Sequence, residues 1–246
     1  MTARALLAAT LAAATMLAGC SHLPEEPGPL PENFRLEPSV APGDGPGALS
    51  PDGFNAAQRM TVRVRNVGCD FLATGTGFAL DAETLVTNRH VIENSRTLEV
   101  STYDGRVIDA TAVSSTTVAD IAIVSVDDSL GGGFPIRAQE DPEEGDIITV
   151  VGYPSGGRLT TVSGVVLGAI SDPLGGSLGR VFATSAQVEP GSSGSPVLNE
   201  SGEVVGVIYA KSTTASNQSF IVPVSTLNTL LAEPSLLVPQ SANCPD

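Results

Sequence analysis

Short β-rich runs, separated by residues that break regular structure, occupy the chain from about residue 58 to residue 232. Runs such as "MTVRVRNV" (60–67) and "DIITVVGY" (146–153) are rich in β-branched residues, and Gly, Pro, Asp or Asn stands between successive runs. Strands of this length and spacing are typical of an antiparallel β-barrel or sandwich. A stretch of about 175 residues can bury a real core in one or two small barrels. The pattern therefore predicts an all-β domain without internal repeats.

One segment near the C-terminus departs from this pattern. Residues 225–237, "STLNTLLAEPSLL", are the only long stretch with a helical period, and serine is a residue type that often caps a helix N-terminus. Proline cannot continue a helix without loss of a hydrogen bond. We therefore expect a short helix that is capped by Ser225 and ends before Pro234, followed by a tail at residues 233–246.

The N-terminal region has the composition of an export signal and a linker. Residues 1–19 carry one charge, Arg4, then an apolar run and small residues, which is typical of a secretory signal peptide. "LAGC" (17–20) resembles the lipobox of bacterial lipoproteins, in which the cysteine is lipidated; an ordinary signal peptide is the alternative. Residues 20–57 are rich in Pro, Gly and acids, which predicts a disordered tether. We expect Cys20 to anchor the protein to the outer face of the membrane.

Charge and cysteine content limit the partners and cofactors. A net charge of −15 provides no electrostatic surface for nucleic acid. Once Cys20 is lipidated, Cys69 and Cys244 remain, and an exported chain is oxidised where geometry permits. A Cys69–Cys244 disulfide is expected, with two separate buried thiols as the alternative. The only histidines are His22 and His90, so we expect no metal site, and nothing in the sequence indicates a cofactor.

The segment "VEPGSSGSPVLN" (188–199) is a Gly-rich serine loop between two strand-like runs. A serine hydroxyl becomes a good nucleophile when a base lies within hydrogen-bond reach and a third group orients that base. His90 is the only imidazole in the folded region. The candidate orienting carboxylates are Asp81, Asp104, Asp109, Asp120, Asp127 and Asp128. Asp120 is favoured because it opens an apolar strand, where a carboxylate without a partner would be costly.

Several motifs occur together and in order: "GTGFAL" (75–80), "LVTNRHVI" (85–92), "ADIAIVSV" (119–126), "PGSSGSPVLNESGEVVGVIYA" (190–210) and "SFIVPVSTL" (219–227). This series resembles the chymotrypsin-fold, or trypsin-like, serine proteases, especially the bacterial HtrA-type and V8-type branches. The resemblance implies two six-stranded antiparallel β-barrels followed by a short C-terminal helix. The protease domain would span residues 58–232, with barrel one at about 58–138 and barrel two at about 144–232.

By the same resemblance, Ser193 is the nucleophile, in preference to Ser192 or Ser195. His90 would act as general base and Asp120 would fix its tautomer. The backbone N–H groups of Gly191 and Ser193 would form the oxyanion hole. The alternative for each triad residue is a structural role: a turn serine, a structural histidine and an aspartate that caps a strand.

The sequence also departs from the family pattern. In zymogen-derived trypsin-like enzymes, an aspartate before the nucleophile pairs with a freed N-terminal ammonium; Ser192 stands at that position here, so we expect no such switch. HtrA proteins usually carry a PDZ domain after the protease. The residues after Ala232 are too few for one, so we expect a protease domain without a PDZ domain.

The resemblance also suggests the walls of the pocket for the side chain before the scissile bond. One wall would be Gln187, Val188 and Glu189, and the other Val207, Ile208, Tyr209 and Ala210, with Lys211 nearby. Val188 and Ile208 favour an apolar or small side chain. The chain lacks both the acid at the base of trypsin's pocket and the extra histidine with which V8-type enzymes select glutamate.

The leading hypothesis is a membrane-tethered serine endopeptidase that acts on extracytoplasmic proteins or peptides. The alternative is a catalytically silent protease-fold module that binds a peptide or a partner protein at the membrane surface. An esterase of the α/β-hydrolase class is excluded, because it needs a strand–turn–helix elbow and places serine before histidine in the chain. Oligomeric state has no signature in the sequence.

Overall fold

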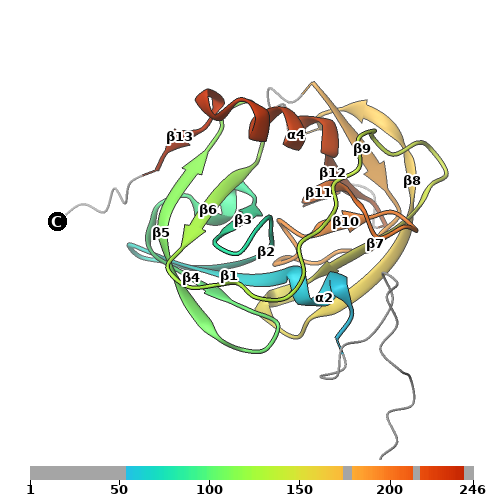
Figure 1. Ribbon diagram of the computed structural model, residues 1–246. Helices are drawn as coiled ribbons and strands as arrows, with labels where there is room; N and C mark the ends of the chain where they lie inside the picture. The colour runs from blue at the N-terminus through green and yellow to red at the C-terminus, as the bar shows by residue number, and fades with distance from the viewer. Residues whose placement is uncertain (1–53, 174–178, 213–216, 241–246) are drawn as a thin grey trace, which may run out of the picture. The chain divides into compact units, whose positions relative to one another are not determined.

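The described residues, 54–173, 179–212 and 217–240 of this computed structural model, form two closed six-stranded antiparallel β-barrels (Figure 1). Barrel one consists of β1 (Thr61–Gly68), β2 (Leu72–Ala79), β3 (Thr84–Thr87), β4 (Ser95–Ser101), β5 (Val107–Ser115) and β6 (Ala122–Val126). Its strands pair in the order β5-β4-β1-β2-β3-β6, and β5 also pairs with β6, which closes the ring.

Barrel two follows a connecting segment and has the same kind of closure. It consists of β7 (Ile147–Gly152), β8 (Thr160–Ser171), β9 (Arg180–Thr184), β10 (Pro196–Leu198), β11 (Val204–Lys211) and β12 (Ser219–Pro223), with the one-turn 3₁₀ helix η1 (Pro154–Gly156) between β7 and β8. The ring order is β10-β11-β12-β9-β8-β7. The expected all-β fold of two six-stranded barrels is confirmed.

Alternation along β12 divides its side chains between two apolar clusters. In β12 every residue is buried. The side chain of Ile221 packs into the core of barrel two, whereas Phe220 and Val222 join a cluster that contains residues of both barrels. That shared cluster includes Phe78 and Ile121 of barrel one. A strand covered on both faces reads as a continuous apolar run, and this is the pattern that "SFIVPV" shows.

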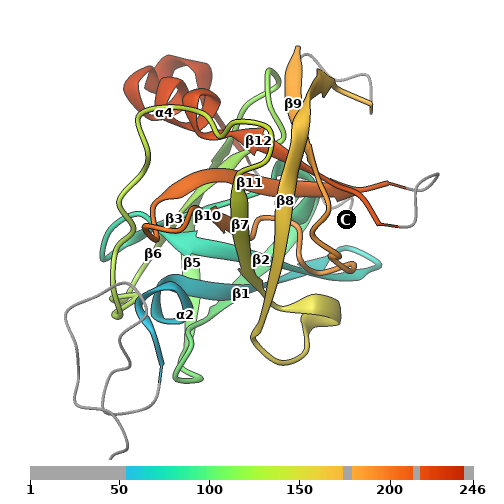
Figure 2. The same cartoon turned by 90° about the vertical axis from the view of Figure 1, so that its right-hand side faces the viewer.

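The C-terminal helix α4 (Val224–Ala232) is present, but Ser225 does not cap it. Pro223 occupies the N-cap position, and Ser225 lies inside the first turn. The backbone N–H of Ser225 donates to Oδ1 of Asp141 at 2.9 Å, and its hydroxyl donates to Oδ2 at 2.8 Å. The predicted cap is therefore wrong, since a carboxylate from the segment between the barrels takes that role. In both views α4 and α2 (Ala56–Met60) lie at opposite ends of the fold (Figure 2).

The described residues include elements outside the two barrels, at both ends of the described range. Asn55 and Gln58 form a capping box at the start of α2, so the folded part begins before the expected position 58. After α4 the chain passes through the short 3₁₀ helix η2 (Pro234–Leu236). It then forms β13 (Val238–Pro239), which pairs with the end of β5. Within the described ranges, no helix is long and apolar enough to cross a membrane. The expected signal peptide, Cys20, nearly all of the tether and Cys244 lie outside the described residues.

Candidate active site

His90 lies on a short helix directly after a buried strand. Strand β3 ends at Thr87, and Asn88 then leads into the one-turn helix α3 (Arg89–Ile92). The amide Nδ2 of Asn88 donates to the backbone carbonyl of Asp120 at 2.7 Å, which ties the start of this helix to the segment before β6. Val91 and Ile92 are buried, whereas the His90 side chain remains 45% exposed. The helix therefore anchors through its apolar residues and presents the imidazole outward.

Asp120 holds His90 through two hydrogen bonds. Its Oδ2 lies 2.5 Å from the ring nitrogen Nδ1 of His90, and its Oδ1 accepts the backbone N–H of His90 at 3.0 Å. Only 16% of the Asp120 side chain is exposed. A carboxylate at Nδ1 favours the tautomer with the proton on Nδ1, which leaves Nε2 as a proton acceptor. This is the relationship expected of the orienting acid and the general base.

Ser193 lies in a tight turn of barrel two that contacts barrel one. The N–H of Thr76 in β2 donates to the Ser193 carbonyl at 2.8 Å. A Cβ added to Gly194 would lie 2.6 Å from Oγ1 of Thr87, the residue three positions before His90. The turn therefore packs against the end of the strand that leads to the histidine. Within the described residues, no hydrogen bond joins the Ser193 hydroxyl to His90. Such bonds are often long in the absence of substrate.

Gly191 and Ser193 each carry a backbone N–H that donates no hydrogen bond within the described residues. The preceding carbonyl, that of Pro190, accepts the N–H of Ser155 at 2.5 Å. All the peptide bonds of the described chain are trans, so the N–H of Gly191 points away from Ser155. Unengaged N–H groups on a rigid turn can bind an oxygen on which negative charge develops.

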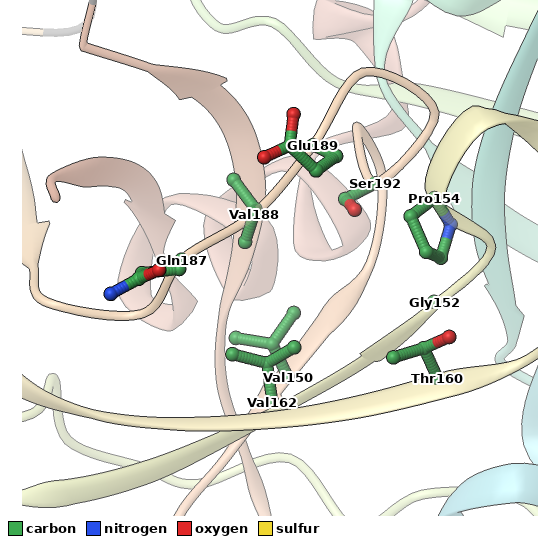
Figure 3. A pocket seen from close by; sticks show the side chains of 9 residues that line it. All are labelled: Val150, Gly152, Pro154, Thr160, Val162, Gln187, Val188, Glu189 and Ser192. Atoms are coloured by element: carbon green, nitrogen blue, oxygen red, sulfur yellow. The ribbon is translucent and has the colours of Figure 1, made fainter. Parts of the chain in front are cut away.

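A cavity of about 120 Å³ lies beside this turn (Figure 3). The predicted wall residues Gln187, Val188 and Glu189 line it together with Ser192. The rest of its lining comes from the β7–β8 hairpin: Val150, Gly152, Pro154, Thr160 and Val162. Figure 3 shows Val150 and Val162 close together beneath the segment that carries Val188 and Glu189. The cavity is therefore bounded by the nucleophile segment and by the hairpin.

The other predicted wall, on β11, does not line this cavity. Ile208 packs in the core of barrel two, and Val207 and Tyr209 pack in the cluster shared by the barrels. Only Ala210 and Lys211, at the end of β11, are less than fully buried. The two predicted walls meet at one ion pair, in which Nζ of Lys211 lies 2.8 Å from Oε2 of Glu189.

Tyr209 was predicted only as part of the wall on β11, but its hydroxyl has a carboxylate partner in the structure. Its hydroxyl donates to Oδ1 of Asp172 at 2.8 Å, and the residue is only 3% exposed. Burial raises the pKa of Tyr209 far above its ordinary value, and the hydrogen bond and charge of Asp172 and the more distant charge of Asp120 act in the same direction. The phenol therefore stays neutral.

Comparisons with known proteins agree with this geometry. The trypsin-like peptidase domain family matches residues 75–207. A serine protease Do-like HtrA of Bacillus subtilis is 33% identical over 131 residues, which are 50% of this chain and 29% of the relative. A periplasmic serine endoprotease DegP-like protein of Halomonas elongata is 30% identical over 172 residues, 68% of this chain and 35% of the relative. The chain thus matches about a third of the length of these relatives.

The Rv3671c protease of Mycobacterium tuberculosis, in a crystal structure of its active form, has a TM-score of 0.68 and 28% identity, covering 76% of this chain and 86% of that one. The chain belongs to the trypsin-like peptidase domain family. Its relatives are HtrA-type serine proteases, and its fold is that of the chymotrypsin-like enzymes.

Proposed function

We propose that this protein is a serine endopeptidase that hydrolyses peptide bonds through an acyl-enzyme formed on Ser193. The observation that carries the proposal is the contact of Asp120 with Nδ1 of His90, which leaves Nε2 of this partly exposed ring as the proton acceptor. The unengaged N–H groups of Gly191 and Ser193 support it. Family membership supports the same reaction class.

In the proposed reaction, Nε2 of His90 takes the proton of the Ser193 hydroxyl as Oγ attacks the peptide carbon. The carbonyl oxygen gains negative charge and binds the N–H groups of Gly191 and Ser193. His90 then gives its proton to the leaving amine. In the second half-reaction, His90 takes a proton from water as the water attacks the acyl carbon, and it returns a proton to the Ser193 oxygen as the acid product leaves. Asp120 stabilises the imidazolium in each half-reaction and remains ionised throughout.

We further propose a preference for an apolar or small side chain before the scissile bond. Support comes from the cavity beside the nucleophile turn, where Val150, Val162 and Val188 supply an apolar lining. Ile208, which the sequence also suggested for this role, lies in the core of barrel two and adds no support. The one carboxylate of the lining, that of Glu189, is paired with Lys211.

We propose that the protein acts outside the cytoplasm, held at the outer face of the membrane by lipidated Cys20. Export is supported by the signal-like residues 1–19 and by the relative that is named periplasmic. The anchor rests on the "LAGC" motif alone. Replacing Cys20 with Ser should move the protein from the membrane fraction to the soluble extracytoplasmic fraction. Membrane retention of that variant would argue against a lipid anchor.

A fluorophosphonate probe tests the catalytic proposal. The purified full chain should be labelled, whereas Ser193→Ala and His90→Ala should not. Ser192→Ala and Ser201→Ala serve as matched controls, because each removes the hydroxyl of a serine close to Ser193 in the sequence and leaves the triad intact. Labelling lost in Ser192→Ala but kept in Ser193→Ala would overturn the assignment of the nucleophile.

The second candidate is a catalytically silent module of the same fold that binds a peptide or a partner protein. The observation that favours it is the missing hydrogen bond between Ser193 and His90 within the described residues. A chain that unfolds cooperatively, binds peptide and yet resists the probe at every pH from about 6 to 9 would establish this alternative.

A further inference from the structure

Thr76 is a fully buried residue of β2 whose polar groups all take part in hydrogen bonds at the site. Its N–H donates to the carbonyl of Ser193 at 2.8 Å, and its carbonyl accepts the hydroxyl of Thr87 at 2.7 Å. Its own hydroxyl donates to the carbonyl of Gly191 at 2.8 Å and accepts the N–H of Tyr153 at 2.9 Å. A single side chain of barrel one thus joins two loops of barrel two.

These two loops determine which way the oxyanion-hole peptides face. The hydroxyl of Thr76 holds the carbonyl of Gly191, and the N–H of Ser155 holds the carbonyl of Pro190. The carbonyl of Pro190 shares a peptide with the N–H of Gly191, so its bond to Ser155 sets the direction of that donor. The carbonyl of Gly191 shares the next peptide with the N–H of Ser192, which donates to the carbonyl of Glu189 at 2.9 Å. Thr76 therefore holds the peptide that lies between the two proposed donors, the N–H groups of Gly191 and Ser193. If the peptide between Pro190 and Gly191 turned over, a carbonyl dipole would replace a donor and oppose the developing charge.

Close packing keeps the two loops in register. Gly191 has a φ of +94°, and a Cβ there would lie 2.7 Å from the backbone N of Ser155 and 2.7 Å from the carbonyl of Tyr153. Ser155 itself has a φ of +54°, a left-handed conformation that is uncommon for a non-glycine residue. The turn at 153–156 is therefore held in a strained geometry by its surroundings, and Thr76 supplies a buried hydrogen bond to it.

We propose that Thr76 is a positioning residue for the oxyanion hole, acting through its hydroxyl to fix the peptide between Gly191 and Ser192, which joins the two donors, to the 153–156 turn. This proposal rests on the proposed function, because it takes Ser193 and Gly191 as catalytic. Thr76 is buried and does not touch substrate. It couples the barrel that carries His90 to the barrel that carries the nucleophile.

Two substitutions at Thr76 distinguish the effect of its hydrogen bonds from the effect of its shape. Thr76→Val keeps the branched shape but leaves the Gly191 carbonyl and the Tyr153 N–H without their partner. Thr76→Ser keeps the hydroxyl and loses only a methyl group. Loss of a whole oxyanion-hole donor typically lowers kcat by about 10²–10³-fold. A donor that is present but misplaced should lower kcat by less than this, and we expect a loss of at least about tenfold.

The test compares kcat and KM for a peptide substrate across three variants of the full chain. Thr76→Val should lower kcat by at least about tenfold with KM within about threefold of the original, and Thr76→Ser should restore most of kcat. Thr61→Val is the matched control. Thr61 is equally buried in the same barrel, and its hydroxyl likewise donates to a backbone carbonyl, that of Ala57, at 2.7 Å. It should lose stability without losing kcat.

Unchanged kcat in Thr76→Val, or an equal loss in Thr61→Val, would overturn the inference. Failure of Thr76→Ser to restore kcat would also count against it, because the methyl group would then matter more than the hydroxyl. Should Thr76→Val not fold, Thr76→Ala and Thr76→Ser are compared instead, and equal kcat values would refute a role for the hydroxyl. An original chain that resists the fluorophosphonate probe would point to failure of the proposed function itself.

Discussion

The carboxylate of Asp120 binds His90 twice, once at ring nitrogen Nδ1 at 2.5 Å and once at the backbone N–H at 3.0 Å. Asp120 thus sets the tautomer of the His90 ring and also fixes the start of helix α3, which carries that ring. Because Asp120 precedes β6 and His90 follows β3, and these two strands pair directly, the contact is built into barrel one.

Asp120→Asn should abolish most activity while preserving the fold. An amide N–H facing Nδ1 favours the opposite tautomer, in which Nε2 carries the proton and cannot accept one from serine. We expect kcat to fall by about 10³–10⁴-fold with a smaller change in KM. Steady-state kinetics measure this, with Asp127→Asn, an exposed aspartate after β6, as the control. Comparable activity in the two variants would remove Asp120 from the triad.

Gly191→Ala should be nearly as harmful as a triad change. The new Cβ would lie 2.7 Å from backbone atoms of both Tyr153 and Ser155, which cannot move without disturbing the hole. Gly145→Ala is a close control, because Gly145 has a φ of +95° but nothing within 4 Å of an added Cβ. Both variants carry the same backbone strain, so only Gly191→Ala should lose kcat. Equal kinetic losses in both would mean that strain alone explains the effect.

The fold could be predicted from the sequence because its strands are marked by local signals. Gly, Pro, Asp and Asn between β-branched runs indicate where strands end. The division into two barrels was implied by the resemblance of the motif series to the chymotrypsin-fold proteases. The contact of His90 with Asp120 was likewise implied by that resemblance, with the position of Asp120 at the start of an apolar strand in its favour. Local sequence signals could not predict a hydrogen-bond partner that lies far away in the sequence. The carboxylate at the start of α4 belongs to Asp141, 84 residues before Ser225.

The specificity pocket shows the second limit of the sequence. A β-strand with one buried face can be identified by alternation, but β11 is buried on both faces, and a bulge near Ile208 shifts its register. Which of its side chains face a ligand therefore depends on packing that no local pattern records. The role of Thr76 could not be predicted for a related reason. A threonine inside a β-rich run is ordinary, and its hydrogen-bond partners Gly191 and Tyr153 are 115 and 77 residues away in the sequence.

Asp141 should contribute to the stability of barrel two rather than to catalysis. Its carboxylate accepts the N–H and the hydroxyl of Ser225 in the first turn of α4, where the helix dipole also favours negative charge. Loss of a capping side chain typically costs about 1 kcal/mol, so Asp141→Ala should lower the free energy of unfolding by that amount. Urea denaturation measures this, with Glu140→Ala, an exposed neighbour, as the control. A kcat close to the original is expected for both variants.

Tyr209 should make stability sensitive to alkaline pH. Because its pKa is raised in the folded chain, the folded state keeps the phenolic proton at a pH where the unfolded chain loses it near its ordinary value of about 10. The stabilisation is therefore complete below about pH 10 and declines as the pH rises further. Urea denaturation at about pH 8 and pH 10.5 should show a larger loss of stability for the original chain than for Tyr209→Phe. Equal losses would show that other groups cause the alkaline effect.

A disulfide between Cys69 and Cys244 was expected from the sequence. Cys69 is disulfide-bonded and follows β1, whereas Cys244 lies outside the described residues, so the pairing stays a prediction. Gln240, four residues before Cys244, lines a cavity with Ser95, and Ser95 pairs with Gly68, the neighbour of Cys69. Gln240 therefore lies near the strand residue that pairs with the neighbour of Cys69.

A reductant should lower the melting temperature, because removal of a native disulfide often costs about 2–5 kcal/mol. Cys244→Ser should have the same low melting temperature as the reduced chain and should show no further effect of reductant. The β13 pairing with β5 should loosen at the same time, which hydrogen exchange at Val238 and Gln240 would detect. Quantitative alkylation of Cys69 and Cys244 without prior reduction would rule the pairing out. A disulfide recovered between Cys69 and Cys20 would replace the pairing and remove the lipidation site as well.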